Sequence, residues 1–130
     1  MGTRIDIPQF DMYKQIVVAE KEGYIELNED YLEVNQQYLY RRAEVDADEV
    51  IIKSRDFRVE SAVYYRTKLR RSDISIVSLS YRDTDKGFEY WQMSIYILGG
   101  DDPVSFYFKK KSSAETAYAT LSEWALPYNK

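Results

Sequence analysis

Along the second half of the chain, hydrophobic and polar side chains alternate with the period of two that is typical of β-strands. The alternation is clearest in residues 91–98 and again in residues 104–109. Between these runs, residues 99–103 read Gly-Gly-Asp-Asp-Pro, which supplies residues that tolerate positive φ and a proline that stops a strand. The pattern therefore predicts a β-hairpin, the strongest in the sequence.

Strand-like runs also precede this hairpin. Residues 50–53 and 62–69 are rich in hydrophobic residues and are separated by a short polar segment. A turn-forming segment at 83–87 separates the run at 77–81 from the run at 88–98. We therefore expect the last three strands to form an antiparallel meander.

The first third of the chain has a less regular pattern. Residues 6–21 are expected to form a short amphipathic helix, with Asp6 as its cap and Pro8 in its first turn. Gly23 would end that helix. Residues 24–42 fit either strands or a helix, and their Tyr, Val and Ile content favours strands.

The period changes from two to 3.6 in residues 112–126, which predicts a C-terminal α-helix. Ser112 and Glu115 have the spacing of a capping box at its start. One hydrophobic stripe runs along it: Ala117, Leu121 and Trp124. A helix that follows antiparallel strands must bury its stripe against the sheet, so we expect this helix to cover the sheet's open end or face. Trp91 and Trp124 are both assigned to the core.

The segment between residues 72 and 77 contains a change of phase. Ile74 and Ile76 are in one phase of the alternation, and Val77 begins the opposite phase. The chain must turn or bulge between them. Ser72 and Asp73 can close such a turn through side-chain hydrogen bonds to the backbone.

The stretch Leu69-Arg70-Arg71-Ser72-Asp73-Ile74-Ser75-Ile76-Val77, followed by three strands and a closing helix, resembles the bacterial pleckstrin-homology-like (PH-like) domains. The resemblance spans residues 49–126. It implies an α+β, mainly β fold: a bent antiparallel sheet or partly open barrel capped by the C-terminal helix. The helix at 6–21 would be an addition to that pattern. The organisation expected is a single domain over residues 1–130, with antiparallel strands in residues 24–108.

Composition sets limits on function. The chain has 130 residues, 45% hydrophobic and 15% aromatic, which is enough for one folded core. It contains no cysteine and no histidine, so thiol nucleophiles, disulfides and imidazole mechanisms are excluded. A net charge of −4 argues against nucleic-acid binding. Hydrophobic runs are too short to span a bilayer, and we expect a cytoplasmic protein. The resemblance to the PH-like domains implies a bacterial origin.

Nothing in the sequence points to catalysis or to a cofactor. Neighbouring acidic residues at 46–49, 83–85 and 101–102 lie in predicted loops, where aspartate favours turns, and none has the spacing of a calcium loop. There is no glycine-rich phosphate loop. The chain is therefore expected to be a non-enzymatic protein without a metal or cofactor.

Thirteen tyrosines are the most unusual feature of the composition. A tyrosine on the outer face of a strand is a rigid amphipathic contact, and tyrosine is enriched at protein interfaces. The candidates for binding a protein partner or a second copy are Tyr40, Tyr64, Tyr96 and Tyr107. The alternative interpretation is that these rings pair with one another across strands.

Basic clusters suggest a second function, the binding of anionic lipid at a membrane surface. The residues that would do so are Lys68, Arg70, Arg71, Lys109, Lys110 and Lys111. The favoured hypothesis is an interaction module that uses a Tyr-rich sheet face or a strand edge, with lipid binding as the alternative. A third possibility is an apolar ligand inside the barrel.

Overall fold

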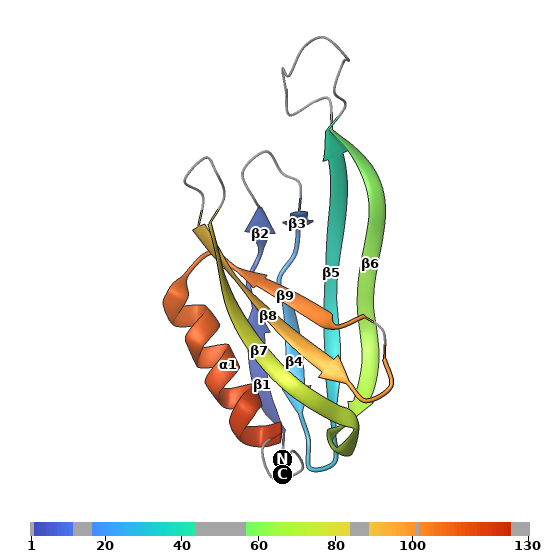
Figure 1. Cartoon of the computed structure of the whole chain (residues 1–130), viewed down its shortest axis with the longest axis vertical. Coiled ribbons are helices and arrows are strands. Elements are labelled where there is room, and N and C mark those ends of the chain that lie inside the picture. The colour runs from blue at the N-terminus through green and yellow to red at the C-terminus, as the bar shows by residue number, and fades with distance from the viewer. Residues whose placement is uncertain (1, 12–16, 44–56, 84–88, 101, 126–130) are drawn as a thin grey trace.

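The computed structural model describes residues 2–11, 17–43, 57–83, 89–100 and 102–125, with the backbone alone at 40–43 and 57–64. Two antiparallel sheets and one long helix make up the fold (Figure 1). The elements are β1 (Thr3–Ile7), β2 (Phe10–Asp11), β3 (Val17–Ala19), β4 (Gly23–Leu27), β5 (Tyr31–Ala43), β6 (Phe57–Arg70), the 3-10 turn η3 (Arg71–Asp73), β7 (Ile74–Asp83), β8 (Glu89–Ile97), β9 (Val104–Phe108) and α1 (Lys111–Ala125).

The larger sheet is built around β5. Strands β4 and β3 pair one after the other along one side of β5, and β6 pairs along its other side. Strand β1 pairs with β4, and β2 pairs with β3, so the sheet has the order β1-β4-β5-β3-β2 with β6 added to β5. Strand β6 is therefore one outer edge of this sheet.

The helix expected over residues 6–21 is not found. The described residues of that range include the end of β1, all of β2 and all of β3. Ile5 and Ile7 are buried while Arg4 and Asp6 are exposed, a period of two that pairs β1 with β4. Pairing with β4 determines the structure of residues 3–7 in spite of the helix-start signals of Asp6 and Pro8. Pro8 is compatible with this, since proline is tolerated where the pairing of a strand stops.

Residues 24–42 form strands, as their composition favours. Alternate residues of β4 and the first part of β5 are buried, which places one face of each strand in the core. The predicted strand at 62–69 lies within β6, whereas the strand predicted at 50–53 falls outside the described residues.

The smaller sheet is the predicted meander, with the order β7-β8-β9. Gly99, in the turn between β8 and β9, has a φ of 74°. Residues that carry a side chain rarely adopt this left-handed backbone conformation, so glycine is favoured there.

The change of phase near residue 75 produces both a turn and a bulge. The turn η3 leads into β7, and the register of β7 against β8 shifts between Ile74 and Ile76. Ile74 and Val77 are consequently buried, and Ile76 points to solvent with 55% of its surface exposed.

Helix α1 packs against all three strands of the smaller sheet and against β1 (Figure 1). The predicted stripe is confirmed, because Ala117 and Leu121 are buried and Trp124 packs against the core. The space between the sheets is filled by fully buried side chains of the smaller sheet: Met93, Ile95, Phe106 and Phe108. This packing gives no support to an apolar ligand in the interior. The helix of the described chain is not long and apolar enough to cross a membrane.

Arg71 joins three segments that are far apart in sequence. Its Nε donates a hydrogen bond to the carbonyl of Trp124 at 2.6 Å, and its Nη1 donates to the carbonyl of Glu29 at 2.9 Å. The Trp124 ring lies 5.0 Å from the guanidinium carbon, and its indole N–H donates to the carbonyl of Asn28 at 2.7 Å. We call this set of contacts the Arg71 fastener. It ties η3 to the end of α1 and to the β4–β5 turn.

Strand β9 crosses in front of the larger sheet without forming a backbone ladder with it (Figure 1). Two tyrosine hydroxyls of the larger sheet approach its free edge instead. The hydroxyl of Tyr38 accepts a hydrogen bond from the backbone N–H of Tyr107 at 3.0 Å, and that of Tyr65 accepts one from Ser105 at 3.5 Å. The two sheets therefore meet through side chains along this line.

Candidate functional site

The four tyrosines proposed as partner contacts differ in how far the structure exposes them. Tyr96 is on the outer face of β8 and is 43% exposed. Tyr107 is only 8% exposed, so the prediction that it faces outward is wrong. Tyr40 and Tyr64 lie in β5 and β6, and their side chains fall outside the described residues. Of the four, Tyr96 is the one that the structure places at the surface.

Tyr107 is buried because both faces of β9 are covered. Its ring lies 4.9 Å from the Tyr38 ring, 5.4 Å from Phe10 and 6.1 Å from Tyr90, between ring centroids. Alternation along a strand separates the two faces of a sheet, but it does not show that another sheet covers both. Many tyrosines of this chain therefore pack with one another, as the alternative interpretation holds.

Tyr38 is the most deeply buried member of this aromatic cluster. Burial raises the pKa of its hydroxyl well above the usual range, because the phenolate loses its hydration. The N–H of Tyr107 donates to that hydroxyl and partly offsets the rise in pKa, and the side chain of Gln36 does so more weakly. Burial also raises the pKa of Tyr65. Both tyrosines are neutral structural groups at neutral pH.

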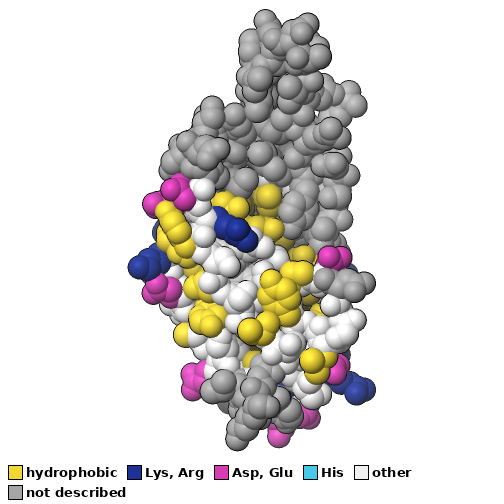
Figure 2. Space-filling model, viewed as in Figure 1, with side chains coloured by type: hydrophobic (Ala, Val, Ile, Leu, Met, Phe, Trp, Pro, Cys, Tyr) yellow, Lys and Arg dark blue, Asp and Glu magenta, His cyan; other side chains and the backbone are white. Residues whose placement is uncertain are grey.

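The outer face of the smaller sheet carries a cluster that we call the apolar patch, formed by Ile76, Tyr96 and Leu98. Ile76 lies directly opposite Tyr96 in the register of β7 and β8, and Leu98 follows Tyr96 by two residues. Leu98 is 62% exposed. Figure 2 shows hydrophobic side chains gathered around a polar centre on this side of the molecule.

The polar centre contains three serines that lie side by side across the smaller sheet: Ser78, Ser94 and Ser105. We call them the serine row. The hydroxyls of Ser94 and Ser105 are 3.1 Å apart, and the amide of Gln92 donates to Ser105 at 3.3 Å. Ser94 and Ser105 are only 4% and 6% exposed, so their hydroxyls are largely covered and satisfy one another beside the apolar patch.

Tyr81 is the fourth large exposed hydrophobic residue, and it lies near the far end of β7. Its hydroxyl donates to the carboxylate of Glu89 at 2.8 Å, and its ring centroid is 5.5 Å from that of Trp91. The hydrogen bond to Glu89 raises the pKa of Tyr81 to about 12. Trp91 itself is partly buried against the core.

Sequence reasoning named Tyr96 but missed Ile76 and Leu98. The signal for Ile76 was the change of phase before Val77, which required a bulge without showing which residue it would turn outward. Leu98 continues the phase of Tyr96 toward the turn at Gly99. Because leucine is usually buried, its sequence position alone did not predict that Leu98 would be exposed.

The basic residues proposed for lipid binding do not form one surface. Lys109 pairs with Asp11, and Lys111 lies 3.7 Å from Glu115, at the junction of β9 and α1. Lys110 is exposed at the same junction. Lys68 and Arg70 lie near the end of β6, at the opposite end of the molecule in Figure 1. A flat bilayer would therefore meet one group at a time, and Arg71 is engaged in the Arg71 fastener.

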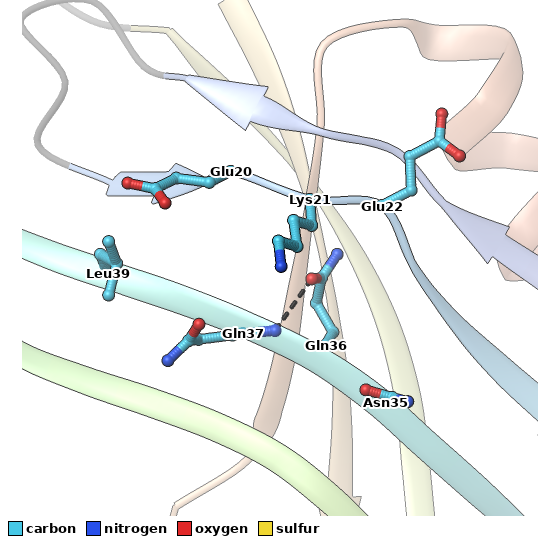
Figure 3. Close-up of a pocket in the computed structure, with 7 residues that line it drawn as sticks. All are labelled: Glu20, Lys21, Glu22, Asn35, Gln36, Gln37 and Leu39. Carbon is cyan, nitrogen blue, oxygen red and sulfur yellow. Dashed lines mark hydrogen bonds between the residues drawn. The ribbon is translucent and has the colours of Figure 1, made fainter.

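A polar hollow of about 360 Å³ lies where the strands beside β5 are interrupted (Figure 3). Between the pairs Val18–Leu39 and Tyr24–Asn35, the five residues that lead from β3 into β4 face three residues of β5. The extra length forms a bulge at residues 20–22. The lining residues are Glu20, Lys21, Glu22, Asn35, Gln36, Gln37 and Leu39.

Gln36 lies at the base of this hollow and is 3% exposed. Its Oε1 accepts a hydrogen bond from the backbone N–H of Gln37 at 2.8 Å, where the bulge interrupts the ladder (Figure 3). No described residue accepts a well-formed hydrogen bond from its Nε2. A Cβ at Gly23 would collide with the Asn35 carbonyl and would lie 2.8 Å from the Gln36 amide carbon, so the close approach here requires glycine. Nothing in the sequence analysis pointed to this hollow.

The acidic residues at 46–49, 83–85 and 101–102 are only partly described. Asp83 and Asp102 are exposed, and the other acidic residues of the three predicted clusters, at 46, 48, 49, 85 and 101, fall outside the described residues. Within the part of the chain that the structure describes, no three acidic side chains group closely enough to hold a metal ion.

Comparisons with known proteins add no identification. Neither the models of protein families, nor the curated proteins, nor the solved structures include a match to this chain.

Proposed function

We propose that this chain is a non-enzymatic interaction module that binds a protein partner, or a second copy of itself, through the apolar patch on the outer face of the smaller sheet. One observation carries this proposal. All four large hydrophobic side chains that are exposed among the described residues belong to the smaller sheet or to the turn after β8, and three of them form the apolar patch. Clustered exposure of this kind marks interaction sites, whereas scattered exposure is ordinary.

The chemistry of this face suits protein recognition. Tyr96 offers a rigid ring that loses little conformational entropy on contact, and rings of this kind anchor many interfaces. Ile76 and Leu98, which are 55% and 62% exposed, add apolar surface beside that anchor.

The arrangement of the chain supports the PH-like part of the proposal. The resemblance implies bent antiparallel strands closed by a C-terminal helix, and two antiparallel sheets with α1 against one of them agree with it. Cytoplasmic location and bacterial origin belong to the same proposal. The warrant is analogy of form, because one fold can serve many functions.

The test compares sedimentation velocity of the wild type with that of a variant carrying Ile76→Ser, Tyr96→Ser and Leu98→Ser. We expect the wild type to self-associate at high concentration and the triple variant to need at least about tenfold more protein for the same shift, because burial of the patch is lost. Tyr81→Ser, which also removes an exposed aromatic ring, serves as the control and is expected to behave like the wild type.

A monomeric wild type would leave a different partner as the occupant, and a photo-crosslinking residue at position 96 would then trap it in cells. Crosslinks from position 96 should disappear in the Ile76→Ser, Leu98→Ser background. Association and crosslinks that are unchanged in both backgrounds would contradict the proposal.

A further inference from the structure

We propose that the outer edge of β6 is a docking strand for an extended, acidic segment of a protein partner. Strand β6 pairs with β5 and with no other described strand, so one side of its backbone lacks a neighbour. In Figure 1 it forms the outer edge of the larger sheet. A free edge of this kind can accept one more strand through backbone hydrogen bonds.

Three cations lie along this edge at two-residue intervals: Arg66, Lys68 and Arg70. All three are exposed. Residues two apart in a strand share one face of the sheet and are about 7 Å apart. Acidic side chains at every second position of an extended peptide repeat at the same interval, so a paired acidic strand would place a carboxylate beside each cation.

Few carboxylates neutralise this row. Lys68 lies 3.4 Å from Glu33 on β5, and its ammonium lies 5.0 Å from the centre of the Tyr31 ring. Among the described residues, no carboxylate forms an ion pair with Arg66 or with Arg70. Since the chain as a whole has a net charge of −4, the edge is a local concentration of positive charge.

The surface beside the row is hollowed in two places that share Lys68. One hollow of about 550 Å³ is lined by Asp30, Tyr31, Lys68, Arg70 and Ser72. The other, of about 310 Å³, adjoins Arg66 and Lys68 and reaches across β5 to Tyr24. Both hollows lie on the side of the row that faces β5, so they leave the cations accessible on the face of the sheet without extending past the free edge.

The same charges specify the occupant. Two copies of this edge would repel each other, because basic side chains on an edge strand oppose pairing with an identical strand. A neutral strand would gain no ion pairs. The edge therefore favours a partner with alternating acidic residues. This surface shares no residue with the apolar patch, so the inference does not depend on the proposed function.

The test uses a fluorescent peptide that alternates glutamate and valine, with binding followed by anisotropy at low salt. Two matched peptides serve as controls: one has glutamine in place of glutamate, and the other keeps the glutamates but has proline in place of the valines. We expect the glutamate–valine peptide alone to bind, and its affinity to fall as salt rises. Proline lacks the N–H that a ladder needs.

The protein variant carries Arg66→Gln, Lys68→Gln and Arg70→Gln. Its matched control carries Lys21→Gln, Arg82→Gln and Lys110→Gln, which removes three exposed cations at other sites. The β6 variant should bind the peptide at least about tenfold more weakly, because three exposed charge pairs are lost together, while the control binds like the wild type. Backbone amides of residues 65–70 should exchange hydrogen more slowly when peptide is bound.

Each other outcome overturns the proposal. Equal binding of the proline peptide would mean attraction between charges without strand addition. Equal loss in both glutamine variants would mean that net charge alone matters. Absence of binding to the glutamate–valine peptide, or binding only to vesicles that contain phosphatidylserine, would assign the edge to another role or to lipid.

Discussion

The backbone groups along the unpaired edges of β9 and β6 are satisfied in different ways. Both strands have a side that no other described strand pairs with. At β9 the backbone N–H groups of Ser105 and Tyr107 donate hydrogen bonds to tyrosine hydroxyls of the opposite sheet, in a buried aromatic cluster. At β6 the free side faces water beside a row of cations. One edge is completed from within the molecule, and the other is protected by charge and stays open.

This difference separates stability from recognition. An N–H buried at the β9 edge must keep its acceptor, because an unpaired buried donor costs about 1–3 kcal/mol. A cation exposed at the β6 edge contributes about 1 kcal/mol or less to folding. Changes at the first edge should therefore alter the free energy of unfolding, and changes at the second should alter binding.

The largest effect is expected from Tyr107→Ser. It removes a buried ring that contacts Tyr38, Phe10 and Tyr90, and large-to-small changes of this kind lower the free energy of unfolding by about 3–5 kcal/mol. Urea denaturation measures it. Tyr96→Ser, made on the exposed face of β8, is the control and should change stability by less than about 1 kcal/mol. Similar losses in the two variants would show that the comparison of the two faces is wrong.

The second largest effect is expected from alkaline pH, which should lower the free energy of unfolding through Tyr38 at the β9 edge. Burial raises the pKa of Tyr38 in the folded state, so its contribution to stability is present below about pH 10 and is lost as the pH rises, because the unfolded chain then releases the proton. The free energy of unfolding should fall by about 1.4 kcal/mol per pH unit above that value for this one group. Denaturation curves across this range should be less steep in pH for Tyr38→Phe. An identical pH dependence in the variant would argue against a neutral, buried Tyr38.

The smallest effects come from the two hydroxyls themselves. Tyr38→Phe leaves the Tyr107 N–H buried without an acceptor and should cost about 1–3 kcal/mol. Tyr65→Phe should cost less than about 1 kcal/mol, since its hydrogen bond to Ser105 is longer and its ring is only partly buried. Thermal or urea unfolding of both variants ranks them, and the reverse order would mean that Tyr65 is the main acceptor at this edge.

Local signals predicted the second half of the fold well. The meander β7-β8-β9, the bulge before Val77 and the buried stripe of α1 each follow from a periodicity that a few neighbouring residues establish. The helix begins at Lys111, one residue before the predicted start.

The first half depended on contacts that sequence does not display. Residues 3–7 are a strand because β4 lies beside them, and Pro8 marks an end of pairing where a helix start was expected. Tyr107 resembles any outward residue of a strand until the approach of β2 and β5 is known. Periodicity shows which residues of a strand share a face. It does not show which other elements cover that face, because this depends on segments far away in sequence.

The candidate surfaces were predicted in part. Tyr96 was named and is exposed, and Lys68 and Arg70 were named and lie on the β6 edge, although Arg66 was not. Arg71 differs from its neighbour Arg70 because the turn η3 directs it toward α1. Sequence shows that arginines are adjacent, and only the turn decides which of them remains available for binding.

The Arg71 fastener also bears on how the molecule loosens. The final turn of a helix ordinarily frays on its own, at a small fraction of the global unfolding free energy. Here the guanidinium of Arg71 connects that turn to η3, which carries Arg71, and to the β4–β5 turn. These three regions should open together, as one cooperative unit whose amides lose protection at the same denaturant concentration.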